Sequence, residues 1–164
     1  MKPDNKTRFL RDNLLLLVGL WGCLALTACQ RDTVFNKTFD TPAPAWAFND
    51  PVCFDLTVID TLARYDLMFS LKHSENYEWM NAFFLITTVF PDMNTAIDTL
   101  ECILATPDGR WLGGRFGKYR NLGFLYKQNI AFPQPGEYRF EVRHAMREDS
   151  LRNITAVGMK ISRS

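Results

Sequence analysis

The chain has 164 residues, of which 47% are hydrophobic and 23% are charged, a composition typical of a folded globular protein. Its 19 basic residues nearly balance its 18 acidic ones and form no run or stripe, so we predict no nucleic-acid partner. Residues 1–28 are expected to be a cleaved leader, as described below. Without them about 136 residues of nearly neutral charge remain, enough for one domain with a sizeable core.

Residues 1–28 have the pattern of a bacterial lipoprotein signal peptide. The sequence Leu26-Thr27-Ala28-Cys29 reads as a lipobox, in which small residues precede a cysteine whose thiol receives diacylglycerol. The apolar run Leu14–Leu26 is too short for a typical membrane-spanning helix. The basic residues before this run are Lys2, Lys6, Arg8 and Arg11. The alternative is an ordinary secretory signal, which has no use for a cysteine at this position, so we predict that Cys29 carries a lipid anchor.

Residues 29–44 are expected to form the lipidated N-terminus and a flexible tether. The segment ends in Thr41-Pro42-Ala43-Pro44, which favours extended polyproline backbone. A tether of this length would hold the domain roughly 30 to 45 Å from the lipid.

Residues 45–164 predict an all-β domain, because short runs of β-branched and aromatic residues alternate with polar residues and are separated by turns. About seven or eight strands in this length indicate a two-sheet β-sandwich of jelly-roll or immunoglobulin-like topology. The run 81–90 is apolar on both phases and is predicted to be a central strand covered on both faces. Residues 147–153 are expected to form a polar connection with one helical turn. The remaining strands are predicted at 52–58, 65–71, 95–105, 122–132, 138–146 and 154–161, with the first two of these as neighbours in a meander and 95–105 forming a hairpin with 81–90.

The segment Trp111–Arg120 is rich in glycine, aromatic and basic residues, and no regular element suits it. Trp111, Phe116 and Tyr119 could stack on a sugar ring, while Arg115 and Arg120 could bind its hydroxyls or a partner's carboxylates. The alternative is an Ω-loop whose aromatic side chains pack onto their own domain. A glycan-binding loop and a structural loop both stay open.

Cys53 and Cys102 are the cysteines that follow the lipobox. An exported protein could join them in one disulfide, but each lies in an apolar run where a free cysteine behaves as a small core residue. His73 and His144 have no partner at metal-ligand spacing, so we predict neither a metal nor a cofactor.

Acidic residues give little support for catalysis. Four acidic residues, Asp92, Asp98, Glu101 and Asp108, fall close together along the chain, and glycoside hydrolysis needs a carboxylate pair. Strand alternation, however, would place Asp98 and Glu101 on opposite faces. The sequence also has no Gly-x-Ser-x-Gly elbow. We therefore predict that the protein is not an enzyme and has no catalytic residues.

A repeated triplet of Asp, then Ser or Thr, then an aliphatic residue is similar to the O-glycosylation acceptor of exported proteins in Bacteroidota. The candidate acceptors are Thr33, Thr61 and Ser150. The same residues are also common at strand ends and in turns, so the alternative is local turn chemistry. A fourth triplet, at Asp98, lies within a predicted strand, where the turn or strand interpretation is favoured.

Three segments resemble the GldH family of gliding-motility lipoproteins of Bacteroidota. They are FFLITTVFPD (Phe83 to Asp92), DTLECILATPDGRWLGG (Asp98 to Gly114) and FPQPGEYRFEVRHAMRED (Phe132 to Asp149). The resemblance implies a lipoprotein needed for gliding and linked with the envelope machinery that includes the type IX secretion apparatus. It implies no enzymatic activity, and only Cys29 is carried over as a functional position.

The residues after the lipobox, Gln30-Arg31-Asp32-Thr33, do not form an acidic surface-export signal. We therefore expect the protein on the outer membrane, facing the periplasm, with other envelope motility or secretion proteins as partners. A glycan-binding lipoprotein that uses the Trp111–Arg120 segment is the alternative.

Overall fold

The structure, a computed structural model, describes residues 32–164. This part of the chain is all-β, as predicted, and contains no helix. Within it, no helix is present that could cross a membrane. The strands are β1 (Thr33–Asp40), β2 (Trp46–Ala47), β3 (Val52–Val58), β4 (Tyr65–Ser74), β5 (Asn81–Val89), β6 (Thr95–Ile103), β7 (Gly114–Phe116), β8 (Tyr119–Ile130), β9 (Gly136–His144), β10 (Ser150–Leu151) and β11 (Ile154–Arg163).

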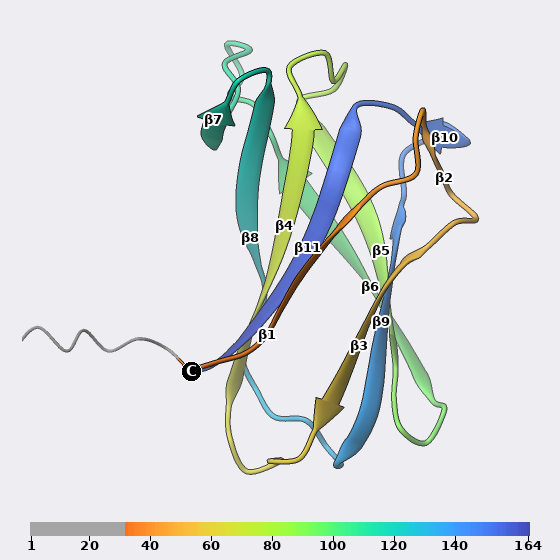
Figure 1. Ribbon diagram of the computed structural model, residues 1–164, viewed down its shortest axis with the longest axis vertical. Coiled ribbons are helices and arrows are strands. Elements are labelled where there is room, and N and C mark those ends of the chain that lie inside the picture. The colour runs from red at the N-terminus through yellow and green to blue at the C-terminus, as the bar shows by residue number, and fades with distance from the viewer. Residues whose placement is uncertain (1–31) are drawn as a thin grey trace, which may run out of the picture. The chain divides into compact units, whose positions relative to one another are not determined.

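Two large antiparallel sheets form the sandwich (Figure 1). One has the order β1-β11-β4-β8-β7 and the other the order β3-β9-β5-β6, while β2 and β10 make a separate two-stranded ribbon. The eight long strands pair as β1 with β11, β3 with β9, β4 with β8, and β5 with β6. The chain is therefore a ribbon of four successive strand pairs rolled into two sheets, which is jelly-roll topology. Of the two sandwich topologies that the sequence left open, the structure has this one.

Alternating side chains form the core between the two sheets. In β4, Leu67, Phe69 and Leu71 are fully buried, and in β5 the buried positions include Phe84 and Ile86. The Phe69 and Phe84 rings meet between the sheets with centroids 5.1 Å apart. Because alternate residues of a strand point to opposite faces, this period-two pattern is what one buried sheet face requires. Burying each such side chain stabilises the fold by about 1.5 to 3 kcal/mol.

A central strand forms within the run 81–90, as predicted, but its two faces are not both buried. β5 lies inside its sheet, paired with β6 on one side and β9 on the other, and the predicted hairpin with β6 is present. Its outward side chains, such as Phe83 and Leu85, are half-buried. They are apolar although no further layer of the described domain covers them, so the prediction of burial on both faces was wrong.

The predicted tether at 29–44 is corrected over residues 33–40, within the part of the chain that the structure describes. Residues 33–40 form β1, which pairs along its length with β11 at the edge of the five-stranded sheet. Phe35 is buried and meets the Phe54 ring at 6.4 Å, and the buried Thr41 hydroxyl donates to the Ile154 carbonyl at 2.6 Å. The polar composition of β1 misled the prediction, because an edge strand that lies against one sheet face needs few apolar side chains.

Two local predictions also fail. Strands 52–58 and 65–71 are not neighbours, because the connection between β3 and β4 passes from one sheet to the other. Residues 147–153 contain no helical turn; Ser150 and Leu151 instead form β10 and pair with Ala47 and Trp46 of β2. This ribbon covers the buried end of β9, where His144 lies against Trp46.

Candidate functional site

The segment Trp111–Arg120 was predicted to lack regular structure, but its residues 114–120 form a hairpin. β7 pairs with the start of β8, and Gly117, with φ of 60°, lies in the turn between them. Gly113 has φ of 78° and lies so close to Leu122 that a Cβ atom would clash with it. Backbone geometry therefore explains two of the glycines that marked this segment as a loop.

Trp111 precedes the hairpin that carries Phe116 and Tyr119. It packs against the core, its ring centroid 4.7 Å from that of the buried His73, and it bridges to Ala105 through the backbone. His73 Nδ1 donates a 2.8 Å hydrogen bond to the Ser74 carbonyl. Burial lowers the pKa of His73, so the ring is a neutral packing partner for the indole.

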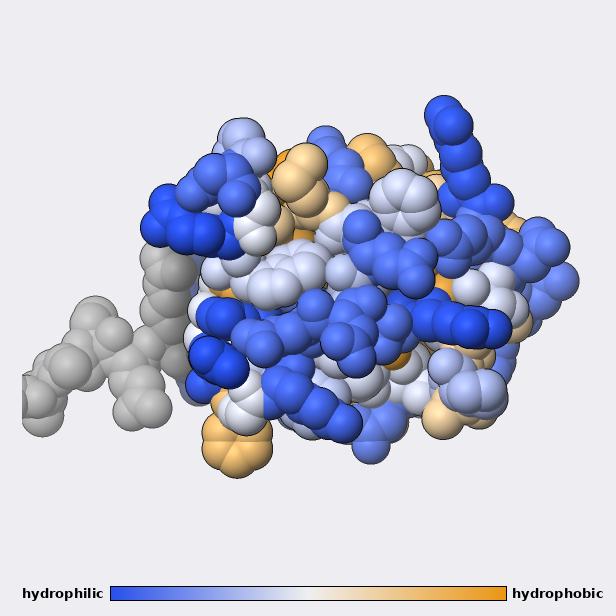
Figure 2. Space-filling view, turned by 90° about the horizontal axis from the view of Figure 1, so that it is seen from above, coloured by the Kyte–Doolittle hydropathy of each residue, from blue (hydrophilic) through white to orange (hydrophobic). Residues whose placement is uncertain are grey.

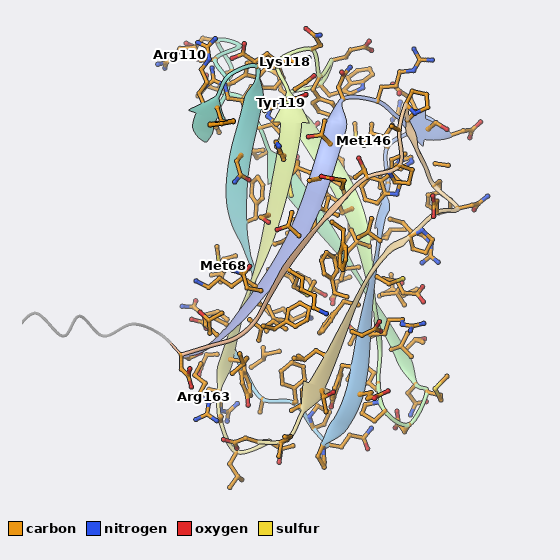
Figure 3. The ribbon with its side chains drawn as sticks, in the orientation of Figure 1. Met68, Arg110, Lys118, Tyr119, Met146 and Arg163 are labelled. Carbon is orange, nitrogen blue, oxygen red and sulfur yellow. The ribbon has the colours of Figure 1, made fainter. Side chains whose placement is uncertain are left out.

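The other residues of the segment lie on the hairpin. Phe116 is 81% exposed, and the Lys72 and Lys118 ammonium groups lie over the Tyr119 ring, 4.8 and 5.6 Å from its centroid. Figure 3 shows Lys118 and Tyr119 together at this end of the sheet. The hairpin therefore offers one exposed ring and not a three-ring platform for a sugar.

Glu75 holds the two arginines of the segment. Arg120 donates to Glu75 Oε1 from Nε at 3.2 Å and from Nη2 at 2.9 Å. Arg115 Nε lies 3.4 Å from the same oxygen and donates to the Gly117 carbonyl at 3.0 Å. Both guanidinium groups are engaged within the domain, and the structural interpretation of this segment is the better supported one.

The two acidic residues that were considered as a catalytic pair, Asp98 and Glu101, do not face each other. Asp98 faces the other sheet, where it accepts hydrogen bonds from Tyr126 at 2.7 Å and pairs with Lys127 at 2.8 Å. Burial opposes the charge of Asp98, but these two partners outweigh it and hold its pKa below the usual value. Glu101 faces outward and accepts from Asn81. The predicted placement of Asp98 and Glu101 on opposite faces is confirmed.

Asp92 and Asp108 serve turns. Asp92 accepts from the backbone and side chain of Asn94, and Asp108 accepts from Arg110. The hydrogen bonds from Asn94 lower the pKa of Asp92, and hydrogen bonds from Thr106 and then Arg110 lower the pKa of Asp108. Residues 32–164 also contain no group of three or more His, Cys, Asp or Glu that could hold a metal ion.

Cys53 and Cys102 are free thiols, so the disulfide that the sequence left open is not present. They lie on β3 and β6, the two outer strands of the four-stranded sheet, and two strands separate them. At about 4.8 Å per strand spacing this is roughly 14 Å, twice the largest separation that a disulfide tolerates. Burial raises the pKa of Cys102 to about 12, as expected of an inert core thiol.

Two hollows were not anticipated from the sequence. One, of about 300 Å³, has Trp79 on its rim, where the indole donates to Glu148 at 3.2 Å; its other lining residues are Phe83, Ala145, Met146, Arg147 and Glu148. The second, of about 410 Å³, lies between the sheets below Asp98 and Lys127 and is lined mainly by apolar side chains. An exposed tryptophan inside a polar connection, Trp79, was the sequence signal for the first hollow.

The candidate O-glycosylation positions are accessible to different degrees. Thr33 and Ser150 are exposed, and Thr61 is half-exposed. Beside Thr61, the Asp60 carboxylate accepts from the backbone of Leu62 and Ala63, which is the turn chemistry of the alternative interpretation. Modification of Thr33, Thr61 and Ser150 stays a prediction. Cys29, the predicted lipidation site, lies outside the described residues.

These features define the described part of the chain as a jelly-roll domain whose polar side chains mainly make structural contacts. The family model described as GldH lipoprotein matches residues 33–161. The chain belongs to this family.

Two curated relatives are similar along nearly their whole length. The gliding motility lipoprotein GldH of Flavobacterium johnsoniae is 30% identical over 161 residues, which cover 94% of this chain and 97% of that protein. The gliding motility lipoprotein GldH homolog of Christiangramia forsetii is 27% identical over 162 residues, with 94% and 99% coverage.

Solved structures are similar only distantly. The Yersinia pseudotuberculosis-derived mitogen has a TM-score of 0.37 at 6% identity and covers 81% of this chain and 86% of its own. The insecticidal delta-endotoxin Cry8Ea1 of Bacillus thuringiensis has a TM-score of 0.37 at 12% identity and covers 71% and 20%. At these scores neither similarity supports an inference about fold or function.

Proposed function

We propose that this protein is a non-enzymatic, lipid-anchored accessory component of the gliding-motility machinery and of the type IX secretion apparatus associated with it. The observation that carries the proposal is the family match along residues 33–161, together with relatives that are named gliding motility lipoproteins. The anchor is the lipid on Cys29, and the site of action is the outer membrane on its periplasmic side.

The described domain supports a binding or scaffolding role. Asp92 and Asp98 are used in a turn and in a contact between sheets, and the buried histidines His73 and His144 each pack against an indole. An accessory component needs a stable shape and an accessible surface rather than a reactive group. The hollow beside Trp79 is the feature of the domain best suited to receive a side chain of a partner protein.

A clean deletion of the gene, complemented with variants, tests the proposal. Wild type and Cys23→Ser should restore colony spreading and the protein content of the culture supernatant. The Cys29→Ser protein should no longer be found in the membrane fraction, because it lacks the thiol that receives the lipid. It should restore neither colony spreading nor the protein content of the supernatant. Cys23 lies in the apolar run of the leader and is the matched control.

Two results would contradict the proposal. If Cys29→Ser stayed with the membrane fraction, the anchor would not be the lipid on this residue. If the deletion strain spread and secreted protein normally, the protein would not belong to this machinery.

A further inference from the structure

The loop between β3 and β4 holds two large aliphatic side chains in water. Ile59 is 86% exposed and Leu62 is 93% exposed. The turn between them is fixed, because Asp60 Oδ1 accepts from the backbone N–H of Leu62 at 3.0 Å and of Ala63 at 3.1 Å. The Tyr65 hydroxyl donates to the Asp60 carbonyl at 2.7 Å. The turn does not use the side chains of Ile59 and Leu62, so the fold itself does not explain why two aliphatic side chains are exposed here.

Other exposed apolar side chains lie at the same end of the sandwich. Val58 is paired with Gly136, which lies beside Pro91 of the β5–β6 turn, so this turn and the β3–β4 loop share one end. Met93 of the turn is 77% exposed. Among the described residues, four large apolar side chains are more than three-quarters exposed; Ile59, Leu62 and Met93 lie at this end, and Phe116 lies at the other.

At the opposite end, apart from Phe116, the large apolar side chains are less exposed: Phe48, Trp79 and Met80 are 41, 46 and 54% exposed. This end carries the β4–β5 and β7–β8 turns and the β2–β10 ribbon (Figure 1). Viewed from that side, the surface is mostly hydrophilic (Figure 2). Exposed apolar residues that are scattered singly are normal, but several at one end of a domain mark a contact surface.

The chain enters the domain at the end that carries Ile59, Leu62 and Met93. The backbone N–H of Arg163 donates to the Asp32 carbonyl at 2.9 Å, and the Arg163 guanidinium donates to Asp60 of the loop at 3.2 Å. Figure 3 places Arg163 at this end. Asp32, the first described residue, is therefore a near neighbour of the β3–β4 loop.

The number of residues between the anchor and the domain limits their separation. Cys29 precedes Asp32 by three residues, which can span at most about 11 Å. The headgroup layer of a bilayer is itself roughly 5 to 8 Å thick. When the acyl chains of Cys29 are in the bilayer, these three residues are too short to give the 30 to 45 Å spacing expected of a long tether. The end of the domain that contains Asp32 must then lie close to the lipid.

We infer that this end of the sandwich rests on the membrane, with Ile59 and Leu62 inserted at the level of the lipid headgroups. The inference rests on the proposed anchoring through Cys29 and adds an orientation to it. Arg64, an exposed residue of the same loop, can reach lipid phosphates while Leu62 enters the apolar boundary.

The orientation decides which surface faces partners. β4 runs the length of the sandwich over 10 residues, which is roughly 30 Å at the rise of a strand. The Trp79 hollow and the β7–β8 hairpin are at the far end of β4 and would be held that far from the lipid. The β3–β4 loop would in turn be shielded by lipid, so Thr61 would be a poor glycosylation position compared with Ser150.

An environment-sensitive fluorophore at single cysteines tests the inference. Leu62→Cys and the control Phe116→Cys, each in a Cys53→Ser background, would be labelled in the full lipidated protein, where Cys102 is buried. Both positions are exposed and apolar, so the two variants are matched and the fold is not disturbed. Each protein would be reconstituted into vesicles of phosphatidylethanolamine and phosphatidylglycerol, with or without lipids that carry a quencher in the acyl chain.

The label at position 62 should shift to the blue in vesicles, and the quencher should lower its emission by roughly half or more, while the label at position 116 is unchanged. Flotation of the vesicles reports the anchor separately. Protein that floats without quenching at position 62 overturns the orientation and leaves the anchoring intact. Protein that does not float overturns both. A blue shift that increases with protein density and is insensitive to the quencher would show that the loop contacts a second copy of the chain. This result would overturn the inference.

Discussion

The indole of Trp111 packs against the imidazole of His73, with ring centroids 4.7 Å apart and ring planes at 57°. His73 is fully buried, and Trp111 is half-buried against the core. Trp111, one of the three sugar-stacking candidates in the sequence, is thus part of the packing between the β6–β7 connection and the five-stranded sheet.

Trp111→Ala should therefore act on stability. We expect a loss of about 2 to 3 kcal/mol in the free energy of unfolding, somewhat below the value for a fully buried tryptophan, measured by urea denaturation of the folded domain. Phe116→Ala removes an exposed ring of the same hairpin and should change stability by less than about 0.5 kcal/mol. Equal stability of the two variants would show that the contact with His73 contributes nothing.

Gly158 is predicted to be intolerant of a side chain. A Cβ atom there would clash with Ser70 and Thr38 and lie 3.1 Å from the Lys37 carbonyl, because β11 is paired on both sides. Gly158→Ala should destabilise the domain by about 1 to 3 kcal/mol, since this site is overpacked.

Gly123→Ala is the control for Gly158, because its Cβ would make an ordinary 3.7 Å contact with Met68 in the same sheet. It should be neutral or stabilise by a few tenths of a kcal/mol, because alanine restricts the unfolded chain. Thermal unfolding of both variants provides the comparison, and a lower melting temperature for Gly123→Ala than for Gly158→Ala would refute it.

The two cysteines should behave as independent thiols. A Cys29→Ser protein should melt at the same temperature with and without reductant, because Cys53 and Cys102 are free. Burial raises the pKa of both thiols, with Cys102 reaching about 12, so Cys102 should react with a thiol reagent only on unfolding and Cys53 should react first. A rise in melting temperature on oxidation without a reducing agent would point instead to a bridge.

Stability should fall as the pH falls below about 6.5, the ordinary pKa of histidine. Burial lowers the pKa of His73 and His144 in the folded domain, so the unfolded chain binds protons that the folded domain rejects. The contribution is therefore fully present above pH about 6.5 and is lost on acidification. His144→Leu keeps a similar volume beside Trp46 and should flatten the dependence between about pH 7 and 5.

The pH range separates the histidines from the carboxylates. Asp92, Asp98 and Asp108 have lowered pKa values, so their contribution is lost only below about pH 4. Urea denaturation at several pH values from about 7 to 5 isolates the histidines. An unchanged slope in His144→Leu would assign the effect to His73 or to other groups.

Much of the local structure could be predicted, because it depends on residues close together in the chain. Alternation in residues 52–58 and 138–144 reports which face of these strands is buried. The same alternation applied to β6 correctly placed Asp98 and Glu101 on opposite faces. The turn at Asp92 and Asn94 was recognisable from composition alone. β1 was missed because a polar edge strand has no such local pattern.

The sequence by itself determined the all-β class, the family and the position of most strands, because side-chain alternation and the matching segments are properties of neighbouring residues. Only the tertiary structure decided the jelly-roll pairing, the separation of Cys53 from Cys102 and the packing of Trp111 on His73. β1 pairs with β11 across more than a hundred residues, and many strand orders bury the same apolar faces almost equally well. The choice among those orders depends on the fit of the complete core, which no single segment contains.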